Sequence, residues 1–198
     1  GHDVHVYDIR QEACAAFAAQ GGVACATLAD LGAACDIVVS VVVNAAQTEE
    51  LLYGTGGLAA ALRPGAVFVM CSTVDPNWSI ALEARLEAQG ILYLDAPISG
   101  GAARAAAGEM TMMTAGRAAA YEACGAVLES MAGKVYRLGD RAGAGSKVKI
   151  INQLLAGVHI AAAAEAMALG LREGVDADAL YDVITHSAGN SWMFENRM

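Results

Sequence analysis

The sequence predicts an α/β protein whose doubly wound parallel sheet is followed by the start of an all-α domain. Two observations carry this prediction. Short segments rich in β-branched residues alternate with alanine-rich helical segments over residues 1–141. The segment 36–43 (DIVVSVVV) is a nearly continuous apolar run, which is typical of a strand buried on both faces of a parallel sheet.

The strands are predicted where β-branched and other apolar residues cluster between turn residues. In chain order, the expected strands are Val4–Asp8, Asp36–Val43, Val67–Cys71, Ile91–Asp95, Met110–Ala115 and Lys134–Arg137. Each is short, and helical segments separate most of them, as a succession of βα units requires.

The helices are predicted from alanine-rich segments and from their start signals. Thr27 suits an N-cap, and Pro76 suits the first turn of a helix. The expected helices are Gln11–Gln20, Thr27–Leu31, Ala46–Leu52, Gly57–Leu62, Pro76–Gln89, Arg117–Met131, Ser146–Glu173 and Asp176–Ser187. The last two follow one another without a strand between them, so the α/β alternation ends before residue 146.

A glycine-rich hinge over Gly139–Gly145 is expected to separate two domains. Residues 1–141 are predicted to form a Rossmann-type domain, and residues 142–198 the beginning of a helical domain. The chain is expected to open on the second strand of the Rossmann unit, with the first strand and its glycine fingerprint preceding Gly1, and to stop early in the helical domain.

The charge balance argues against nucleic acid as a partner. Twelve Lys and Arg against 21 Asp and Glu leave a net charge of −9, and no basic run occurs. Nucleic acid is therefore not an expected partner, because phosphate contacts need clustered Lys and Arg. The hydrophobic content of 56% is ample for a buried core.

Five cysteines, an odd number without C-x-x-C spacing, predict free thiols in a cytoplasmic protein and no metal site. The polar start of the chain does not resemble a signal peptide. The apolar segment Leu154–Leu171 contains His159 and Glu165, so a buried helix between domains is expected and a membrane span is not. Such an apolar helix also predicts a homodimer or homotetramer.

Asp8 is the candidate for recognising the ribose of a dinucleotide. It ends the first expected strand, where an acidic residue binds the ribose 2′-hydroxyl in a Rossmann unit. A carboxylate there repels a 2′-phosphate, so NAD is expected in preference to NADP, although nearby Arg10 is able to accept that phosphate. The alternative is that Asp8 only caps the following helix.

Further cofactor contacts are expected at the ends of the next strands, where nucleotides bind in such sheets. Val43 and Asn44 end the second expected strand, and Thr73 follows the third. The alternatives are that the valines are simple core residues and that the Ser72–Thr73 hydroxyls only cap the helix at Pro76.

Ser99, Gly100 and Gly101 are the candidates for binding a substrate carboxylate. Glycine tolerates the backbone conformations that turn several N–H groups inward, and clustered N–H groups bind anions. Asp95 is expected to orient this loop by accepting its N–H groups. The alternative is a tight turn without a ligand.

Lys149 is the candidate general acid/base. A lysine at the start of a helix lies next to the positive end of the helix dipole, which favours a chemical role over a stabilising one. Asn152 and Gln153 lie three and four residues on and share its helix face, so they are the expected contacts of the substrate hydroxyl. The alternative is two surface lysines on a capped helix.

Taken together, five segments resemble the β-hydroxyacid dehydrogenase family, which includes 3-hydroxyisobutyrate dehydrogenase and tartronate semialdehyde reductase. They are Val6–Asp8, Ser72–Pro76, Asp95–Gly101, Gly108–Gly116 and Gly143–Gln153. Within the family, Lys149–Gly170 and His186–Arg197 are most similar to members that act on L-threonate.

The resemblance implies that Lys149 is the catalytic lysine, that the Ser-Gly-Gly loop binds the substrate carboxylate and that Thr73 contacts the cofactor. Many members carry Asn four residues after the lysine, whereas Gln153 stands here and Asn152 precedes it, so either amide is a candidate. Two rival classes are a non-catalytic scaffold of the same fold and a Rossmann-like transferase, but neither needs Lys149 together with the Ser-Gly-Gly loop.

Overall fold

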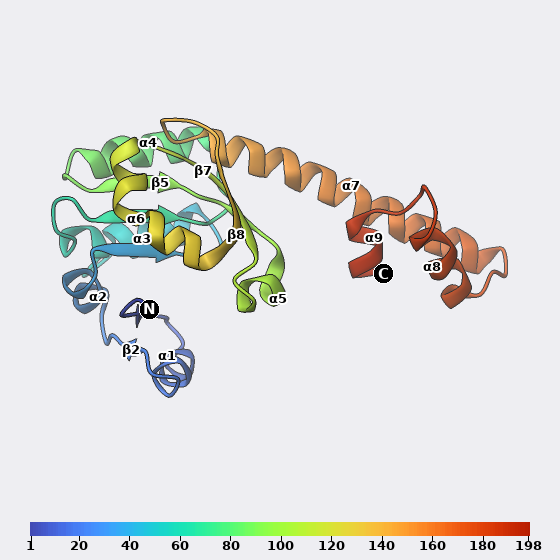
Figure 1. Ribbon diagram of the computed structural model, residues 1–198, viewed down its shortest axis with the longest axis horizontal. Helices are drawn as coiled ribbons and strands as arrows, with labels where there is room; N and C mark the ends of the chain where they lie inside the picture. The colour runs from blue at the N-terminus through green and yellow to red at the C-terminus, as the bar shows by residue number, and fades with distance from the viewer. The chain divides into compact units, whose positions relative to one another are not determined.

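The computed structural model describes residues 1–198 and contains two compact units, residues 1–149 and 150–198. The first unit is an α/β domain, and the second consists of helices (Figure 1). Helix α7 (Ala144–Arg172) begins in the first unit and continues into the second. The predicted α/β fold class is confirmed.

The main sheet has a parallel half and a half in which two strands, β7 (Met110–Gly116) and β8 (Ala132–Arg137), run in the opposite direction. Strands β3 (Ile37–Ser40), β4 (Val67–Met70) and β5 (Leu92–Asp95) are parallel neighbours. Strand β7 runs antiparallel to β5. The remaining strands of this sheet, β6 (Ile98–Ser99) and β8, both pair with β7. The sheet is therefore mixed at one side, where the sequence predicts only parallel strands.

A separate parallel pair lies at the start of the chain. It joins β1 (His5–Val6) to β2 (Val23–Ala24) through the helix α1 (Gln11–Ala18). This βαβ unit has the expected order, but both strands are only two residues long. The expected strand Val4–Asp8 is thus shorter than predicted, because hydrogen bonding to β2 is confined to its centre.

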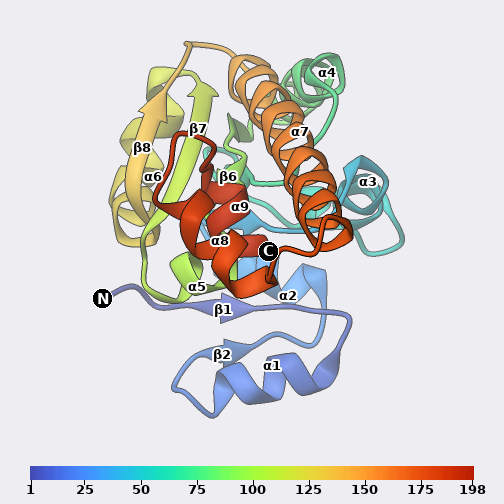
Figure 2. The same ribbon diagram turned by 90° about the vertical axis from the view of Figure 1, so that its right-hand side faces the viewer.

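Helices cover both faces of the main sheet. Those of the first unit are α2 (Leu28–Ala34), α3 (Ala45–Tyr53), the 3-10 turn η1 (Leu58–Ala60), α4 (Pro76–Glu87), α5 (Gly101–Ala106) and α6 (Ala118–Met131). Helix α6 packs against β7 and β8 (Figure 2). The second unit adds α8 (Ala177–Thr185) and α9 (Trp192–Arg197) to the long α7.

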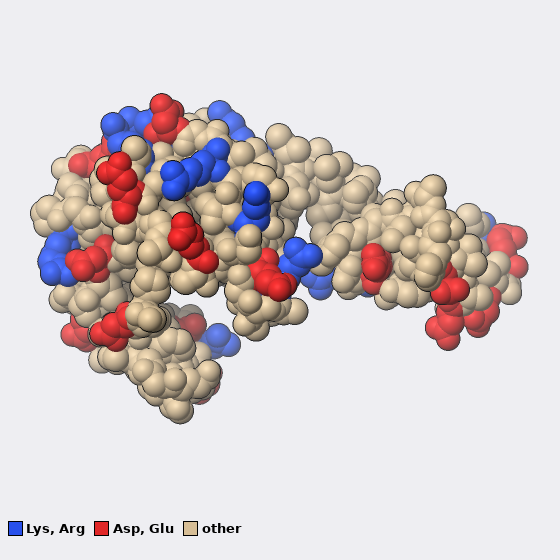
Figure 3. Space-filling view, viewed as in Figure 1, with Lys and Arg blue, Asp and Glu red and all other residues tan.

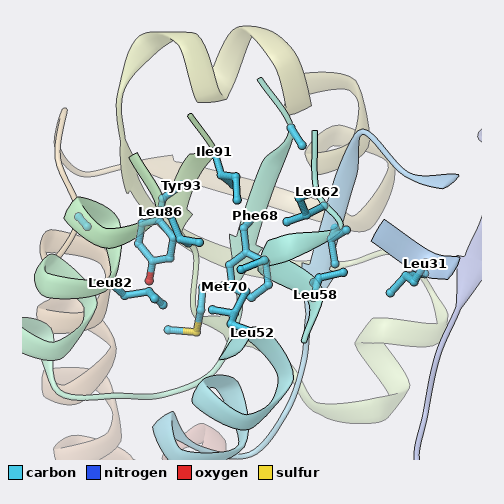
Figure 4. Packing of buried hydrophobic residues seen from close by; sticks show 14 of the residues in the cluster. Leu31, Leu52, Leu58, Leu62, Phe68, Met70, Leu82, Leu86, Ile91 and Tyr93 are labelled. Carbon is cyan, nitrogen blue, oxygen red and sulfur yellow. The ribbon is translucent and has the colours of Figure 1, made fainter. Parts of the chain in front are cut away.

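Strand β4 is the centre of the core, since all four of its residues are buried. Phe68 and Met70 point to one face, where they join leucines of α3, η1 and α4 (Figure 4). Val67 and Val69 point to the other face, where α6 covers them. Successive side chains of a strand alternate between faces, so a strand covered on both sides needs apolar residues throughout.

Two helix starts follow the predicted local chemistry. Thr27 caps α2, and Asp30 returns the contact to the Thr27 N–H group, which completes a capping box. Pro76 occupies the first turn of α4, and the Asp75 side chain caps that helix by accepting the N–H groups of Asn77 and Trp78.

The prediction of one buried strand over Asp36–Val43 is wrong in its second half. Strand β3 ends at Ser40, and the Val41 and Val43 side chains are 63% and 77% exposed. Pairing with β4 ends at Ser40, so the next residues leave the sheet and lead into α3. The expected helix Gly57–Leu62 is only the 3-10 turn η1, and β2, β6, α5 and α9 are too short to produce a periodic signal.

The expectation that Leu154–Leu171 is buried is not met within this chain. Side chains along α7, including Ile151, Leu154 and Val158, are more than half exposed. Helix α7 is long and apolar enough to cross a membrane by length and composition alone, which by itself is weak evidence of a span. In the second unit α8 packs on α7 at Gly170, where a side chain would collide with Leu180, but most of the apolar face stays uncovered.

Replacing Phe68 with Ala should lower the free energy of unfolding of the first unit by about 3–5 kcal/mol, because the change leaves a cavity between β4 and the helices on its face. Urea denaturation monitored by circular dichroism measures the change. Ile9→Ala, at a side chain that is 85% exposed, serves as the control and should have little effect. A similar loss in the two variants would contradict the assignment of the core.

Candidate active site

The candidate site lies at the carboxyl ends of the parallel strands. Strands β3, β4 and β5 point the same way, so the residues that follow them meet at one edge of the sheet. The Ser72 hydroxyl donates to the Val42 carbonyl and joins the segments after β4 and β3. The next residue, Thr73, is exposed at this edge.

The alternative that Ser72 and Thr73 cap α4 is wrong, because Asp75 caps that helix. After β3, Asn44 caps α3 by accepting the Gln47 N–H group at 2.9 Å. Its amide nitrogen donates to no group of the chain. The Val43 N–H group donates to the Gln47 side chain, and the Val43 side chain is exposed, so it is not a core residue.

Asp8 follows β1 and is half-buried. Its Oδ1 accepts both the backbone N–H of Arg10 at 2.8 Å and the Arg10 guanidinium. The backbone hydrogen bond and then the side-chain hydrogen bond from Arg10 lower the pKa of the Asp8 carboxyl. Oδ2 has no partner, and Asp8 is not the N-cap of α1, which is Arg10. One carboxylate oxygen is thus available to accept a hydroxyl.

The Ser-Gly-Gly loop connects β6 to α5. Gly100 and Gly101 have φ angles of 137° and 72°, a region that other residues rarely adopt. Neither glycine N–H group donates a hydrogen bond within the chain. A side chain on Gly100 would collide with Arg104, whose aliphatic stem lies against it. The loop therefore presents two unpaired donors next to a basic side chain.

Arg104 was not anticipated from the sequence as a site residue. Every other arginine of the first unit forms an ion pair or stacks on a tyrosine ring, whereas Arg104 does neither. On the face shown in Figure 3, acidic and basic side chains are interspersed over the first unit. A basic residue three positions after the Ser-Gly-Gly loop was the available signal.

The expectation that Asp95 holds the Ser-Gly-Gly loop is wrong. Both of its carboxylate oxygens accept hydrogen bonds from the start of α7: Oδ2 accepts the N–H groups of Gly143, just before the helix, and of Ser146 in its first turn, and Oδ1 accepts the Ser146 hydroxyl. Burial raises the pKa of this carboxyl, and the donors of Ser146 and Gly143 oppose that rise. The local sequence does not reveal the partner, because Ser146 lies 51 residues away.

Lys149 lies on the second turn of α7 and is only 7% exposed. Burial lowers the pKa of its ammonium group, because the charged form loses water. No hydrogen bond or ion pair from this ammonium is found within the chain. The alternative of two surface lysines is therefore wrong for Lys149, while Lys147 is exposed.

The structure brings part of the predicted set into one unit. Lys149, the Ser-Gly-Gly loop and Thr73 belong to the first unit, and Asp8 belongs to its separate β1–β2 pair. Asn152 and Gln153 follow on α7 in the second unit, with Asn152 half-buried and Gln153 exposed. Ser146 was missed as a site residue, although its spacing of three from Lys149 places both on one helix face.

Two family models match the chain. The NAD-binding domain of 6-phosphogluconate dehydrogenase matches residues 1–139, and the NAD-binding domain of NADP-dependent 3-hydroxyisobutyrate dehydrogenase matches residues 143–198. Over all 198 residues the chain is 66% identical to an L-threonate dehydrogenase of Cupriavidus necator, of which it spans 67%. The chain belongs to the 3-hydroxyisobutyrate dehydrogenase-related family of β-hydroxyacid dehydrogenases.

Other members agree with this assignment. An L-threonate dehydrogenase of Escherichia coli is 50% identical over an alignment of 187 positions, which covers 88% of this chain and 62% of that enzyme. A crystal structure from Salmonella typhimurium described as 3-hydroxyisobutyrate dehydrogenase matches this chain with a TM-score of 0.94 and 48% identity. The match covers 99% of this chain and 68% of the Salmonella typhimurium chain. The β-hydroxyacid dehydrogenase fold thus accounts for both units.

Replacing Lys149 with Met should stabilise the protein at neutral pH. An unfolded lysine titrates near its ordinary pKa of about 10.4, whereas the folded pKa is lower, so the unfolded chain binds more protons between the two values. The stability of the wild type therefore rises with pH through this window and approaches that of the variant. Urea unfolding from pH 7 to pH 10.5 measures the difference.

Lys147→Met is the matched control, because it removes an exposed lysine from the same helix and should leave the pH dependence unchanged. If Lys149→Met proved less stable than the wild type at pH 7 and the gap did not depend on pH, the inferred burial of the charge would be wrong.

Proposed function

We propose that this polypeptide, at the length of its relatives, oxidises a small hydroxy acid with NAD⁺ as the hydride acceptor, and that the substrate is L-threonate, oxidised at C2. The observation that supports this choice of substrate is the 66% identity, over the whole chain, with an L-threonate dehydrogenase. The buried Lys149 near the carboxyl edge of the sheet supports the chemistry.

The substrate carboxylate is proposed to bind the N–H groups of Gly100 and Gly101 beside Ser99, because these donors are unpaired and both glycines have φ angles that other residues rarely adopt. Arg104 adds an unpaired positive charge next to Gly100. Asn152 or Gln153, on the helix face of Lys149, is proposed to hydrogen-bond a substrate hydroxyl.

Lys149 is proposed to move the proton. In its neutral form it accepts the proton of the reacting hydroxyl while the carbon that bears this hydroxyl loses a hydride, and a carbonyl forms. In the reverse direction the ammonium returns the proton to the carbonyl oxygen. Burial lowers the pKa of Lys149 toward the range where a lysine exchanges protons efficiently near neutral pH.

The residues present fit a dinucleotide. Oδ2 of Asp8 is free to accept a ribose hydroxyl, and Asn44 has an unpaired amide nitrogen beside the exposed Val43. Thr73 presents an exposed hydroxyl at the same sheet edge as Asn44. When bound, NAD⁺ supplies the hydride acceptor, and the protein supplies orientation and electrostatics. A negative charge at Asp8 disfavours the 2′-phosphate of NADP.

The runner-up activities are those of a 3-hydroxyisobutyrate dehydrogenase or a tartronate semialdehyde reductase, which differ by one or two substituents on the acid. A non-catalytic member of the fold is the alternative from another class. The exposed apolar side chains of α7 support a homodimer or homotetramer, and the five free cysteines support a cytoplasmic location.

Replacing Lys149 with Ala should lower kcat for L-threonate about 10²–10⁴-fold, which is the usual contribution of a positioned acid or base. The assay follows NADH absorbance in a chimaera that extends this chain to the length of the Cupriavidus necator enzyme with the flanking segments of that enzyme.

Lys147→Ala, at an exposed lysine of the same helix, is the control and should keep its turnover. Near-normal turnover in Lys149→Ala would refute the catalytic role. Turnover of 3-hydroxyisobutyrate in preference to threonate would keep the family and refute the substrate, and no turnover of any hydroxy acid would favour the non-catalytic alternative.

Replacing Asp8 with Ala should lower the preference for NAD⁺ over NADP⁺ about 10- to 100-fold, because one charge-assisted hydrogen bond to the ribose is lost and the repulsion of a 2′-phosphate is removed. The ratio of kcat/KM for the two cofactors in the same chimaera measures this preference. Asp3→Ala removes an exposed carboxylate from the same unit and should leave the ratio unchanged. An unchanged ratio in Asp8→Ala would remove Asp8 from the cofactor site.

A further inference from the structure

The carboxylate of Asp95 is fully buried at the end of β5, and it accepts three hydrogen bonds from the start of α7. It accepts the Gly143 N–H at 2.8 Å, the Ser146 N–H at 2.9 Å and the Ser146 hydroxyl at 2.7 Å. Burying a charge is costly unless hydrogen bonds compensate for the lost water, so the buried carboxylate depends on these three donors.

This contact differs from an ordinary helix cap. A capping side chain belongs to the residue just before its helix, whereas Asp95 lies 48 and 51 residues before its two partners. The hydrogen bonds therefore determine where α7 starts relative to the sheet as well as satisfying its free N–H groups. Gly145 allows this close approach, because a side chain there would collide with the carbonyl of Met113.

The same contact lies one turn before Lys149. Ser146 and Lys149 share a helix face and are 1% and 7% exposed, while Lys147 and Val148 between them face solvent. The ammonium of Lys149 has no partner within the chain, so no contact at its tip holds it in place. The position of Lys149 therefore follows from the depth and rotation of the first turns of α7.

We propose that Asp95 and Ser146 are positioning residues for Lys149: their hydrogen bonds fix the translation and rotation of α7 at the carboxyl edge of the sheet and so set where the lysine amine meets the substrate. This inference rests on the proposed function of Lys149. A displacement of about 1 Å at a reacting group is enough to cost about 10²-fold in rate.

A second buried carboxylate holds the segment before the helix and has a different role. Glu83, on α4, is 1% exposed and accepts the Ala142 N–H at 3.2 Å and the Arg141 guanidinium at 2.9 Å. Both partners precede α7, so Glu83 binds the loop that leads into the helix, whereas Asp95 also binds a residue of the helix itself. Only the Asp95 contact is on the helix face that carries Lys149.

The test replaces Ser146 with Ala, which removes the hydroxyl donor and leaves the backbone intact. In the chimaera described above, kcat for L-threonate should fall about 10- to 100-fold, while KM for NAD⁺ changes little because the cofactor residues are elsewhere. Thr114→Val is the matched control, since Thr114 is a fully buried hydroxyl on β7 with two hydrogen bonds and no contact with α7 in the hydrogen-bond network.

A second readout needs no activity. In this 198-residue chain, reductive methylation with ¹³C-formaldehyde and NMR titration reports the pKa of each lysine amine. Release of α7 should expose Lys149 and raise its pKa toward that of an exposed lysine in Ser146→Ala, but not in Thr114→Val. Asp95→Asn should have the same effect, and if that variant does not fold, Ser146→Ala decides alone.

An unchanged kcat together with an unchanged Lys149 pKa in folded Ser146→Ala would overturn the positioning role, as would equal losses in Ser146→Ala and Thr114→Val. If the unmodified chimaera turns over no hydroxy acid, the proposed function fails. The NMR titration then still decides whether the hydrogen bonds between Asp95 and Ser146 set the environment of Lys149.

Discussion

The buried carboxylate of Asp95 is the constraint on which the arrangement of the first unit depends. An ionised group with no exposed surface must find its donors inside the protein, and the donors come from the start of α7. The end of β5 and the beginning of the helix are therefore joined by charge-assisted hydrogen bonds, which are stronger than those between neutral groups. Gly145 is part of the same constraint, because a side chain there would collide with the carbonyl of Met113 and crowd Asp95.

The parallel half of the sheet concentrates chemistry at one edge. Parallel strands deliver the residues after β3, β4 and β5 to the same side, and Ser72 ties two of these segments together. The reversal at β7 is equally consequential, because β6 pairs with β7 and thereby holds Ser99 at the start of the Ser-Gly-Gly loop. The Ser-Gly-Gly loop therefore begins on a strand that is hydrogen-bonded into the sheet.

Whether a prediction was confirmed depended on how far along the chain the interactions that determine the feature extend. Thr27, Pro76 and strand β4 were predicted because a cap, a first-turn proline and a short run of β-branched and other apolar residues are local features of the sequence. The assignment of Val41 and Val43 to a buried strand failed because composition does not show where a neighbouring strand stops pairing. The apolar face of α7 shows the same limit, since hydropathy predicts that a surface needs cover but not that this chain supplies it.

By itself, the sequence determined the α/β class, the order of most elements and the identity of the residues able to do chemistry, because these depend on local propensity and on side-chain type. Lys149, the Ser-Gly-Gly loop and Asp8 were selected as candidates from side-chain type and spacing together with the resemblance to the family. The tertiary structure alone decided which of these groups are buried and what they contact. In the structure Asp95 accepts hydrogen bonds from Ser146 and not from the Ser-Gly-Gly loop, and the Lys149 ammonium has no partner. A contact between residues that are 51 positions apart depends on how the strand and the helix pack, so it leaves no pattern in the sequence of either segment.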